Sequence, residues 1–298
     1  MRYAIGIQIG FARIEAGIVS EGGFLIQKEN VQNNPSDKEK MFRQVVHCVE
    51  QLMDHCSLPK KEIAGIGVGI PGNVDRHNGI ALFQNNLPWK DFPIADRLQQ
   101  AVGINAIIDN DVCMAAFAEW KEAGLQEGGL FVYMAISTGI SCSIIKNGEF
   151  IRGAGLAGAA GLIPVLDPDQ KRMIRFEQMV SAPALQARAS RLFANEQLEA
   201  KDLFTKYHHG VPEVKQAVNE LATSISYVLY VVASLLDPHK IVLGGSIAAY
   251  NPFLLELLKS ELAKHLLPEQ RHILDGIEIS YPDNSQVVMG AGMRFFYT

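Results

Sequence analysis

Apolar positions near the start of the chain alternate with small and polar ones, and then change to helical spacing. Residues 2–9, 13–19 and 23–29 alternate in this way between glycine-containing turns, which predicts an antiparallel meander. The stretch Ser36-Asp37-Lys38-Glu39 has the form of a capping box, and apolar residues from Met41 to Met53 recur at helical spacing after it. The run IAGIGVGIPGNVD then predicts a buried strand that ends near residues 70–75.

The rest of the chain repeats this order of elements. A short helix from about Pro93 and the strand INAIID precede an amphipathic helix that ends at Gly124. From Gly129 a second meander begins, and it is followed by helices at about 174–193 and 212–236, the strand KIVLGG, a helix from Pro252 to about His265, the strand IEISYP and a final helix near GAGMRFF. The pattern predicts an α/β fold of two domains, 1–118 and 119–298, built from duplicated β-β-β-α-β-α-β-α units that flank a cleft. The last helix can pack back on the N-terminal domain.

Composition and charge narrow the class of protein. Apolar residues make up 48% of the 298 residues and charged residues 20%, as in ordinary soluble globular proteins. The net charge of −5 is spread without a like-charge run, so we expect no nucleic-acid partner. Apolar runs are too short to span a bilayer and the start lacks the pattern of a signal peptide, so we expect no membrane association and a cytoplasmic protein. The cysteines have no metal-binding spacing, and we predict no metal ligated by them.

Three glycine-containing turns have the chemistry of phosphate-binding loops. They are IGFAR at 9–13, STGIS at 137–141 and LGGS at 243–246. Backbone N–H groups at such turns form a concavity for anionic oxygens. Each turn alone is typical of a hairpin or a strand-to-helix connection, and none matches a Walker loop. Because they recur at equivalent places of the repeated units, together they predict a nucleotide held between the domains.

Asn110 and Asp111 lie where a buried strand meets the next helix. One interpretation is structural, since Asn and Asp at such a position commonly cap the helix. The other is catalytic: a carboxylate at the carboxyl end of a strand can take the proton from a substrate hydroxyl as it attacks a phosphoryl group.

With these residues placed, the chain resembles the ROK family of bacterial sugar kinases and sugar-responsive repressors. The resemblance rests, in order, on IGIQIGFARIEAGIV, GIGVGIPGNVD, NLPWKDFPI, DNDVCMAAFAEW, ISTGISCSIIKNGEFIRG, GAAG and LLDPHKIVLGGSI. It implies a two-domain actin-like ATPase (ribonuclease H-like) fold and ATP-dependent phosphorylation of a hexose or related sugar with Mg²⁺. No winged-helix segment precedes the first strand, so we expect a kinase and not a repressor.

The resemblance also implies roles for individual residues. Asp111 corresponds to the catalytic base. The sugar-binding positions are Gly72, Asn73, Asn85, Asn86, Asn110 and Glu177. The nucleotide-binding positions are Gln8, Gly10, Phe11 and Ala12 in the first turn, Thr138 and Gly139 in the second, and Gly244 and Gly245 beside the adenosine.

The chain departs from the family pattern at two places. The first motif of the family reads Asp-x-Gly-Gly-Thr, with an acid that organises Mg²⁺, whereas this chain has Gln8, Phe11 and Ala12. A Gly-Glu-x-Gly-His motif further on holds sugar hydroxyls, and here Ala159 and Leu162 replace its polar residues. Residues between Leu162 and Phe176 include no Cys or His, so the structural zinc of many members is predicted absent.

These departures keep two functions open. The first is an active sugar kinase that uses ATP and Mg²⁺, with Asp111 as its base. The alternative is a catalytically impaired relative that binds a sugar or a nucleotide without turnover. A homodimer is compatible with either function, and the sequence does not name the sugar.

Overall fold

The computed structural model describes residues 2–84, 86–167, 170–193, 198–281 and 285–298. The chain forms two compact units, Met1–Gly124 together with Asp283–Thr298, and Leu125–Pro282. The sequence analysis placed the domain boundary at residue 118, which lies inside a helix that continues to Ala123. Gly124, in the left-handed conformation, ends that helix, and the second unit begins after it.

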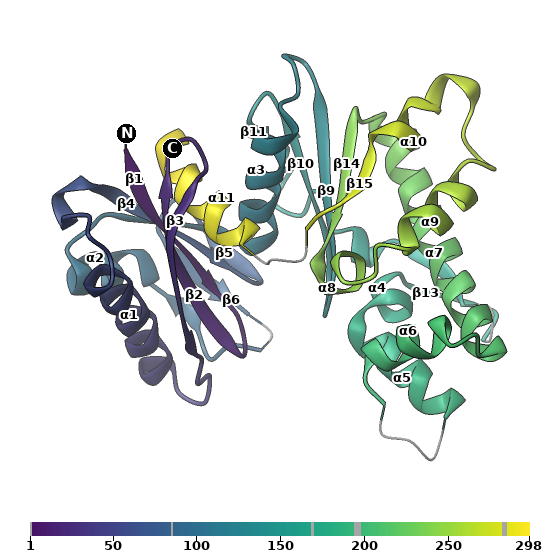
Figure 1. Cartoon of the computed structure of the whole chain (residues 1–298), viewed down its shortest axis with the longest axis horizontal. Coiled ribbons are helices and arrows are strands. Elements are labelled where there is room, and N and C mark those ends of the chain that lie inside the picture. The colour runs from purple at the N-terminus through teal and green to yellow at the C-terminus, as the bar shows by residue number, and fades with distance from the viewer. Residues whose placement is uncertain (1, 85, 168–169, 194–197, 282–284) are drawn as a thin grey trace. The chain divides into compact units, whose positions relative to one another are not determined.

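The first unit is a mixed sheet with helices on both faces (Figure 1). Its sheet has the strand order β3-β2-β1-β4-β8; β1 pairs antiparallel with β2, and β4 pairs parallel with β1 and β8. The elements are β1 (Tyr3–Ile9), β2 (Arg13–Ser20), β3 (Leu25–Gln32), α1 (Lys38–Asp54), η1 (Lys60–Glu62), β4 (Ile63–Ile70), β5 (Asn73–Asp75), β6 (Ile80–Phe83), β7 (Lys90–Phe92), α2 (Ile94–Val102), β8 (Ala106–Asn110), α3 (Asp111–Ala123), α11 (Gln286–Arg294) and η4 (Phe295–Tyr297).

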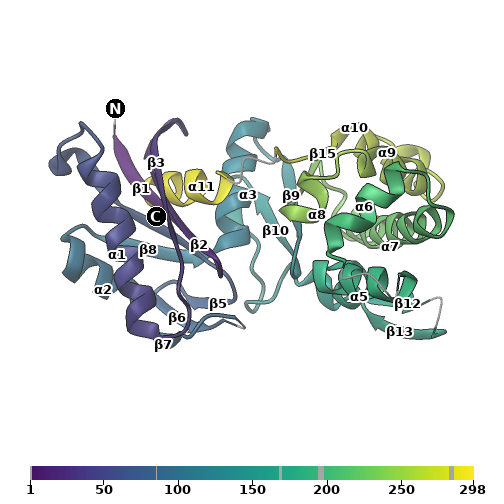
Figure 2. The same cartoon turned by 60° about the horizontal axis from the view of Figure 1, so that its bottom comes forward.

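Helix α1 covers one face of this sheet (Figure 2). Its N-cap is Asp37, one residue later than the Ser36 of the expected capping box, and the Asp37 carboxylate accepts hydrogen bonds from the N–H groups of Glu39 and Lys40 at 3.0 and 2.8 Å. The apolar side of α1 packs on alternate residues of β1, β2 and β4, which form the core of the unit.

Helix α11 lies on the other face, beside α3 (Figures 1 and 2). Glycines allow this packing, because a Cβ added at Gly6 would lie 1.8 Å from the carbonyl oxygen of Val288, and one at Gly67 would lie 1.9 Å from that of Ala291. A Cβ at Gly290 would meet the carbonyl oxygen of Met114 in α3 at 1.7 Å. The C-terminal helix therefore fixes α3, which begins with Asp111, against the sheet.

The second unit repeats the sheet of the first. Its strand order is β11-β10-β9-β14-β15, with an antiparallel pair β9–β10 and parallel pairs β9–β14 and β14–β15. The elements are β9 (Leu130–Ile136), β10 (Ile140–Lys146), β11 (Glu149–Phe150), η2 (Ala160–Leu162), β12 (Pro164–Asp167), β13 (Arg172–Arg175), α4 (Glu177–Val180), α5 (Ala182–Leu192), α6 (Ala200–His208), α7 (Pro212–Leu236), β14 (Lys240–Gly244), α8 (Gly245–Ala249), α9 (Leu254–Leu262), η3 (Pro268–Gln270), α10 (His272–Gly276) and β15 (Ile277–Ile279).

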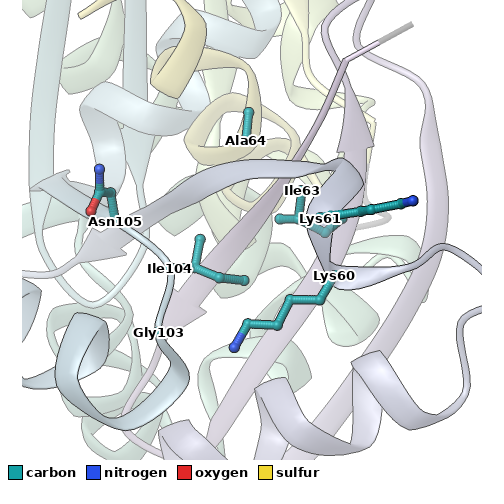
Figure 3. A pocket seen from close by; sticks show the side chains of 7 residues that line it. All are labelled: Lys60, Lys61, Ile63, Ala64, Gly103, Ile104 and Asn105. Atoms are coloured by element: carbon teal, nitrogen blue, oxygen red, sulfur yellow. The ribbon is translucent and has the colours of Figure 1, made fainter.

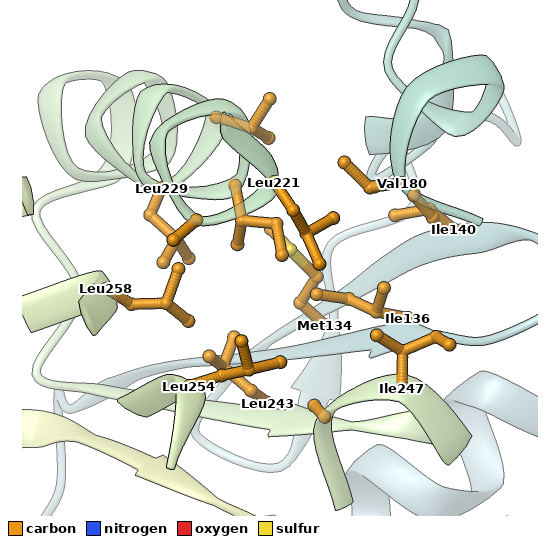
Figure 4. Close-up of a cluster of buried hydrophobic side chains, with 14 of the residues drawn as sticks. Met134, Ile136, Ile140, Val180, Leu221, Leu229, Leu243, Ile247, Leu254 and Leu258 are labelled. Atoms are coloured by element: carbon orange, nitrogen blue, oxygen red, sulfur yellow. The ribbon is translucent and has the colours of Figure 1, made fainter. Parts of the chain in front are cut away.

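Buried leucine, isoleucine and methionine side chains from β9, β14, α7 and α9 form the core of this unit (Figure 4). Helix α7 is apolar and long enough to span a membrane by length and composition, and half of that stretch is buried inside the structure. The helix expected at 174–193 is instead the end of β13 followed by α4 and α5, which are separated at Ser181. The sequence analysis did not foresee α6.

Candidate active site

Asp111 and Asn110 lie at the junction of β8 and α3, as the sequence predicted. Asn110 is the N-cap: its Oδ1 accepts a hydrogen bond from the N–H of Val112 at 2.9 Å. The same N–H is 2.9 Å from Oδ1 of Asp111. Asn110 is therefore the N-cap of α3, and the Asp111 carboxylate shares the same N–H donor.

The environment of Asp111 favours its protonated form. The side chain is half-buried at the start of α3, and desolvation raises the pKa of Asp111 from its ordinary value of 3.8 to about 6, although hydrogen bonds from backbone N–H groups oppose the rise. A carboxylate whose pKa lies near neutrality is suited to accept and release a proton at physiological pH. Raised pKa values of this kind occur more often at functional sites than elsewhere.

The turn between β4 and β5 lies against this junction. The Nδ2 group of Asn110 donates a hydrogen bond to the carbonyl oxygen of Gly72 at 3.0 Å. Gly72 has a φ of 86°, and a Cβ there would lie 2.5 Å from the carbonyl oxygen of Phe83, so glycine is required for both reasons. Asn73, which follows Gly72, and Asn86, in the loop after β6, are both exposed. Asn85 lies outside the described residues.

The first glycine turn is held in place by the end of β3. The N–H of Gly10 bonds to the carbonyl oxygen of Arg13 at 2.9 Å. The carbonyl oxygens of Gly10 and Ala12 accept hydrogen bonds from the side chain and the N–H of Asn33, at 2.7 and 2.9 Å. Phe11 projects from this turn with 60% of its surface exposed. The backbone is therefore well fixed, while the apolar ring faces outward.

Residues that the sequence analysis did not single out lie beside Gln8. Glu15 on β2 is directly opposite Gln8 on β1, and its carboxylate is buried. Arg13 and Lys28 each lie 3.2 Å from this carboxylate, and Lys28 also donates to the hydroxyl of Ser285, the N-cap of α11. One sequence feature could have indicated this charge cluster: Glu15 is an acidic residue within the otherwise apolar run that follows the first turn.

The second unit brings the other two glycine turns together. The hydroxyl groups of Ser137, beside Thr138 and Gly139, and of Ser246, beside Gly244 and Gly245, lie 3.0 Å apart. Gly245 has a φ of 79°, and a Cβ there would lie 2.5 Å from the carbonyl oxygen of Ile136 at the end of β9. Thr138 and Gly139 are exposed, and a Cβ at Gly139 would meet nothing within 4 Å. Both turns therefore form one patch of small and hydroxyl residues.

Glu177 lies against the loop at 158–161. A Cβ at Gly161 would be 3.1 Å from Oε2 of Glu177, and Oε1 of Glu177 is 3.7 Å from the Arg175 guanidinium. The loop is anchored on β10, because the carbonyl oxygen of Gly158 accepts a hydrogen bond from the N–H of Cys142 at 2.6 Å. Leu162 is exposed at the end of this loop. An acidic side chain and an apolar one thus flank the same loop.

A pocket of about 470 Å³ in the first unit lies away from these residues (Figure 3). Its lining comes from η1, the start of β4 and the link from α2 to β8, namely Lys60, Lys61, Ile63, Ala64, Gly103, Ile104 and Asn105. Asp111 and Gly72 follow the opposite, carboxyl ends of β8 and β4. Ligands of α/β sheets bind at those carboxyl ends, so this pocket does not coincide with the candidate site.

Metal-binding side chains are dispersed. Within the residues that the structure describes, no group of three or more His, Cys, Asp or Glu side chains could hold a metal ion. Two oxygens near the first turn nevertheless fit a hard cation. Oε1 of Gln8 and Oε2 of Glu15 are buried without a hydrogen-bond partner, and Mg²⁺ prefers oxygen ligands of this kind.

Comparisons with known proteins identify the family. The ROK family profile matches residues 4–294. A glucokinase from Halalkalibacterium halodurans is 26% identical over 316 residues, which cover 98% of this chain and 94% of the glucokinase.

Solved structures agree with this match. A ROK family glucokinase from Streptomyces griseus, in complex with glucose and AMPPNP, is 24% identical and has a TM-score of 0.77 over 97% of each chain. A ROK family protein from Streptococcus pneumoniae, in complex with sucrose, is 20% identical and has a TM-score of 0.83, over 99% of this chain and 98% of that one. These likenesses confirm the predicted actin-like α/β fold. Because the family profile spans almost the whole chain, the chain belongs to the ROK family.

Proposed function

We propose that this protein transfers the γ-phosphoryl group of ATP to a hydroxyl of a hexose or related sugar. The observation that carries the proposal is Asp111, which lies at the carboxyl end of β8 with a pKa raised to about 6 by burial. Relatives named glucokinase support the reaction class, including the one from Halalkalibacterium halodurans and one from Streptomyces coelicolor.

In this proposal Asp111 accepts the proton of the attacking sugar hydroxyl, and Asn110 orients that hydroxyl while its own Nδ2 stays bonded to Gly72. Further sugar contacts are assigned to Asn73, Asn85, Asn86 and Glu177. The turns at Gly10–Ala12 and Thr138–Gly139 bind phosphates through backbone N–H groups, and Gly244–Gly245 flanks the adenosine. When bound with ATP, Mg²⁺ neutralises phosphate charge during transfer.

We expect the part of the substrate that faces Ala159 and Leu162 to be less polar than the corresponding part of free glucose. Ala159 and Leu162 offer no hydrogen bond at the loop that Glu177 contacts. Loss of two buried hydroxyl partners costs roughly 1 to 3 kcal/mol each when nothing replaces them. We therefore expect a β-glucoside or a deoxy sugar to be a better substrate than an unmodified hexose.

An ADP-release assay with ATP and Mg²⁺ across hexoses, amino sugars, deoxy sugars and β-glucosides tests the proposal. Asp111→Asn should lower turnover of the best substrate by about 10²- to 10⁴-fold, the usual effect of removing a general base, with sugar binding largely kept. Unchanged turnover in this variant would exclude Asp111 as the base.

The alternative function, a relative that binds without catalysis, has its own outcome in the same experiment. Thermal shifts of the wild-type protein with a sugar or a nucleotide, combined with no ADP release for any sugar, would establish it. We place the reaction in the cytoplasm, in keeping with cysteines that form no disulfide, namely Cys48, Cys56, Cys113 and Cys142. A homodimer is a further proposal, and light scattering tests it.

A further inference from the structure

One row of side chains crosses four neighbouring strands of the first unit at the level of Gln8. Gln8 on β1 is opposite Glu15 on β2 and Gly69 on β4, and Gly69 is in turn opposite Asp109 on β8. Residues at one level of a sheet point to the same face and are about 5 Å apart. A Cβ at Gly69 would lie 3.4 Å from the Cα of Asp111, so this row leads directly to the proposed base.

Two oxygens of this row, on directly opposite residues, have no hydrogen-bond partner. Oε1 of Gln8 and Oε2 of Glu15 are both inaccessible to solvent and accept no hydrogen bond. The contact of Oε2 with the Lys28 ammonium, at 3.2 Å, is an ion pair whose geometry is not that of a hydrogen bond. Unsatisfied buried oxygens are uncommon in folded proteins because they lose their hydration without compensation. Two of them on directly opposite residues of β1 and β2, beside a proposed phosphate turn, call for a functional explanation.

We propose that Glu15 supplies the carboxylate for the divalent cation of the bound nucleotide, with Gln8 Oε1 as a neutral second ligand. This inference rests on the proposed function, because the cation arrives with ATP. Mg²⁺ in phosphoryl-transfer sites is held by one or two protein oxygens together with phosphate oxygens and water, so two side-chain ligands are enough. Gln8 brings no charge, and Glu15 provides it from the neighbouring strand.

Asp109 is a poorer source of this charge. Its side chain is also buried, and its Oδ1 accepts a hydrogen bond from the N–H of Asn110 at 2.8 Å. It lies two strands away from Gln8, with Gly69 between them. The space above Gly69 is filled from α11, because a Cβ at Gly69 would lie 2.5 Å from Cγ1 of Val287. The Asp109 carboxylate is therefore separated from the first turn.

Two cations now balance the Glu15 carboxylate. The Arg13 side chain is 61% exposed and lies on the first turn, whereas the Lys28 side chain is 28% exposed and also bonds to Ser285. A divalent cation at Oε2 would have to displace the Lys28 ammonium, which competes with it for the same oxygen. The simpler interpretation is that Glu15 only forms ion pairs with these two residues, and the experiment has to separate the two roles.

The register makes a further consequence explicit. An aspartate at position 8 would place two carboxylates directly opposite each other on β1 and β2, and like charges in that arrangement destabilise a sheet. A divalent cation would relieve that repulsion, so Gln8→Asp by itself should tighten the metal site while it lowers the stability of the metal-free protein. The double variant Gln8→Asp/Glu15→Gln moves the carboxylate from β2 to β1. It keeps one negative charge in the row and should therefore keep the metal affinity of the wild type.

The test measures Mn²⁺ binding to the full chain with ADP present, by the electron paramagnetic resonance signal of free Mn²⁺. Glu15→Gln should weaken Mn²⁺ binding by at least tenfold, the Gln8→Asp/Glu15→Gln pair should return it to within about threefold of the wild type, and Gln8→Asp alone should tighten it, because the cation relieves the repulsion between two opposed carboxylates. Lys28→Gln should tighten Mn²⁺ binding, because a competing cation is gone. Glu29→Gln, which removes a carboxylate of β3 that pairs with His55, is the matched control and should have no effect.

A Mn²⁺ affinity that is unchanged in both Glu15→Gln and Lys28→Gln overturns the inference, as does wild-type protein that binds no Mn²⁺ with ADP. If Glu15→Gln does not fold, the Lys28→Gln result decides. Failure of the inference is distinguishable from failure of the proposed function. Sugar phosphorylation with a Mn²⁺ affinity independent of Glu15 refutes only the inference, whereas Glu15-dependent Mn²⁺ binding without turnover of any sugar refutes only the kinase.

Discussion

Asp111→Asn should make the protein more stable at neutral pH while it lowers the proposed sugar-kinase turnover. Burial raises the pKa of Asp111 from 3.8 to about 6, which means that the folded state holds this proton to higher pH than the unfolded state does. Ionisation of Asp111 therefore destabilises the folded state as pH rises between about 4 and 6, and the full effect is present above pH 6. Asparagine removes the charge, is nearly isosteric and can still accept the bond from the N–H of Val112.

The magnitude follows from the two pKa values. The interval from 3.8 to about 6 corresponds to about 3 kcal/mol at roughly 1.4 kcal/mol for each pH unit. Solvent reaches part of the half-buried side chain, so we expect Asp111→Asn to gain about 1 to 3 kcal/mol at pH 7 to 8. Below pH 4 the wild-type carboxyl is protonated in both states, and the gain should disappear.

Urea denaturation of wild type and Asp111→Asn at pH 4, 5, 6, 7 and 8 measures this difference. Asp96→Asn, at an exposed position in the first turn of α2, is a control for general loss of one negative charge. Asp111 is not a destabilised carboxylate if Asp111→Asn is less stable than wild type at pH 8. Nor is it one if the difference in unfolding free energy between the two proteins is the same at pH 4 and pH 8. A rise in stability together with lost turnover is the combination that a functional residue predicts.

Further predictions concern the turns, the packing of α11 and the cysteines. The added Cβ of Gly139→Ala meets open space, so this variant should keep the wild-type Tm while it weakens ATP binding. The added Cβ of Gly245→Ala lies 2.5 Å from a backbone carbonyl oxygen at a φ of 79°, so this variant should lower the Tm. Thermal-shift measurements with and without ATP distinguish the two effects. Gly290→Ala places a Cβ 1.7 Å from a carbonyl oxygen of α3, and it should destabilise the first unit by about 3 kcal/mol or more in urea denaturation. Burial raises the pKa of the Cys142 thiol to about 12, so iodoacetamide at pH 8 should modify the half-buried Cys56 long before Cys142, as peptide mass spectrometry would show.

Local patterns were sufficient to predict most of the framework. Glycine-punctuated alternation predicted both meanders, because strand period and turn chemistry are local properties. The helix expected at 174–193 failed for a different reason. Val165 and Ile174 face each other across the β12–β13 hairpin, so pairing between strands determines the structure there. Residues 174–175, expected to begin a helix, therefore end the strand β13. Pairing across a hairpin depends on the partner strand and is invisible in the spacing of one segment.

The sequence predicts those parts of the candidate site that depend on neighbouring residues in the chain. It does not predict the parts that depend on how residues of two strands pair. The position of Asp111 at the start of a helix was predictable because a polar pair interrupts the junction of an apolar strand and that helix. Glu15 was missed because its relation to Gln8 comes from pairing between β1 and β2, seven residues apart in sequence. Lys28 enters the same cluster from β3, through its contact with Glu15.

The pattern of substitutions also bears on what this chain has kept. Backbone features of the proposed nucleotide site are intact: Gly10 is bonded within its turn, and Gly245 keeps the left-handed conformation against β9. The departures are side chains on a fixed backbone, with Phe11 and Leu162 both exposed. Binding through backbone N–H groups tolerates such changes, whereas recognition of sugar hydroxyls depends on side chains. We therefore expect the departures at Ala159 and Leu162 to affect the choice of sugar more than the binding of the nucleotide through backbone contacts.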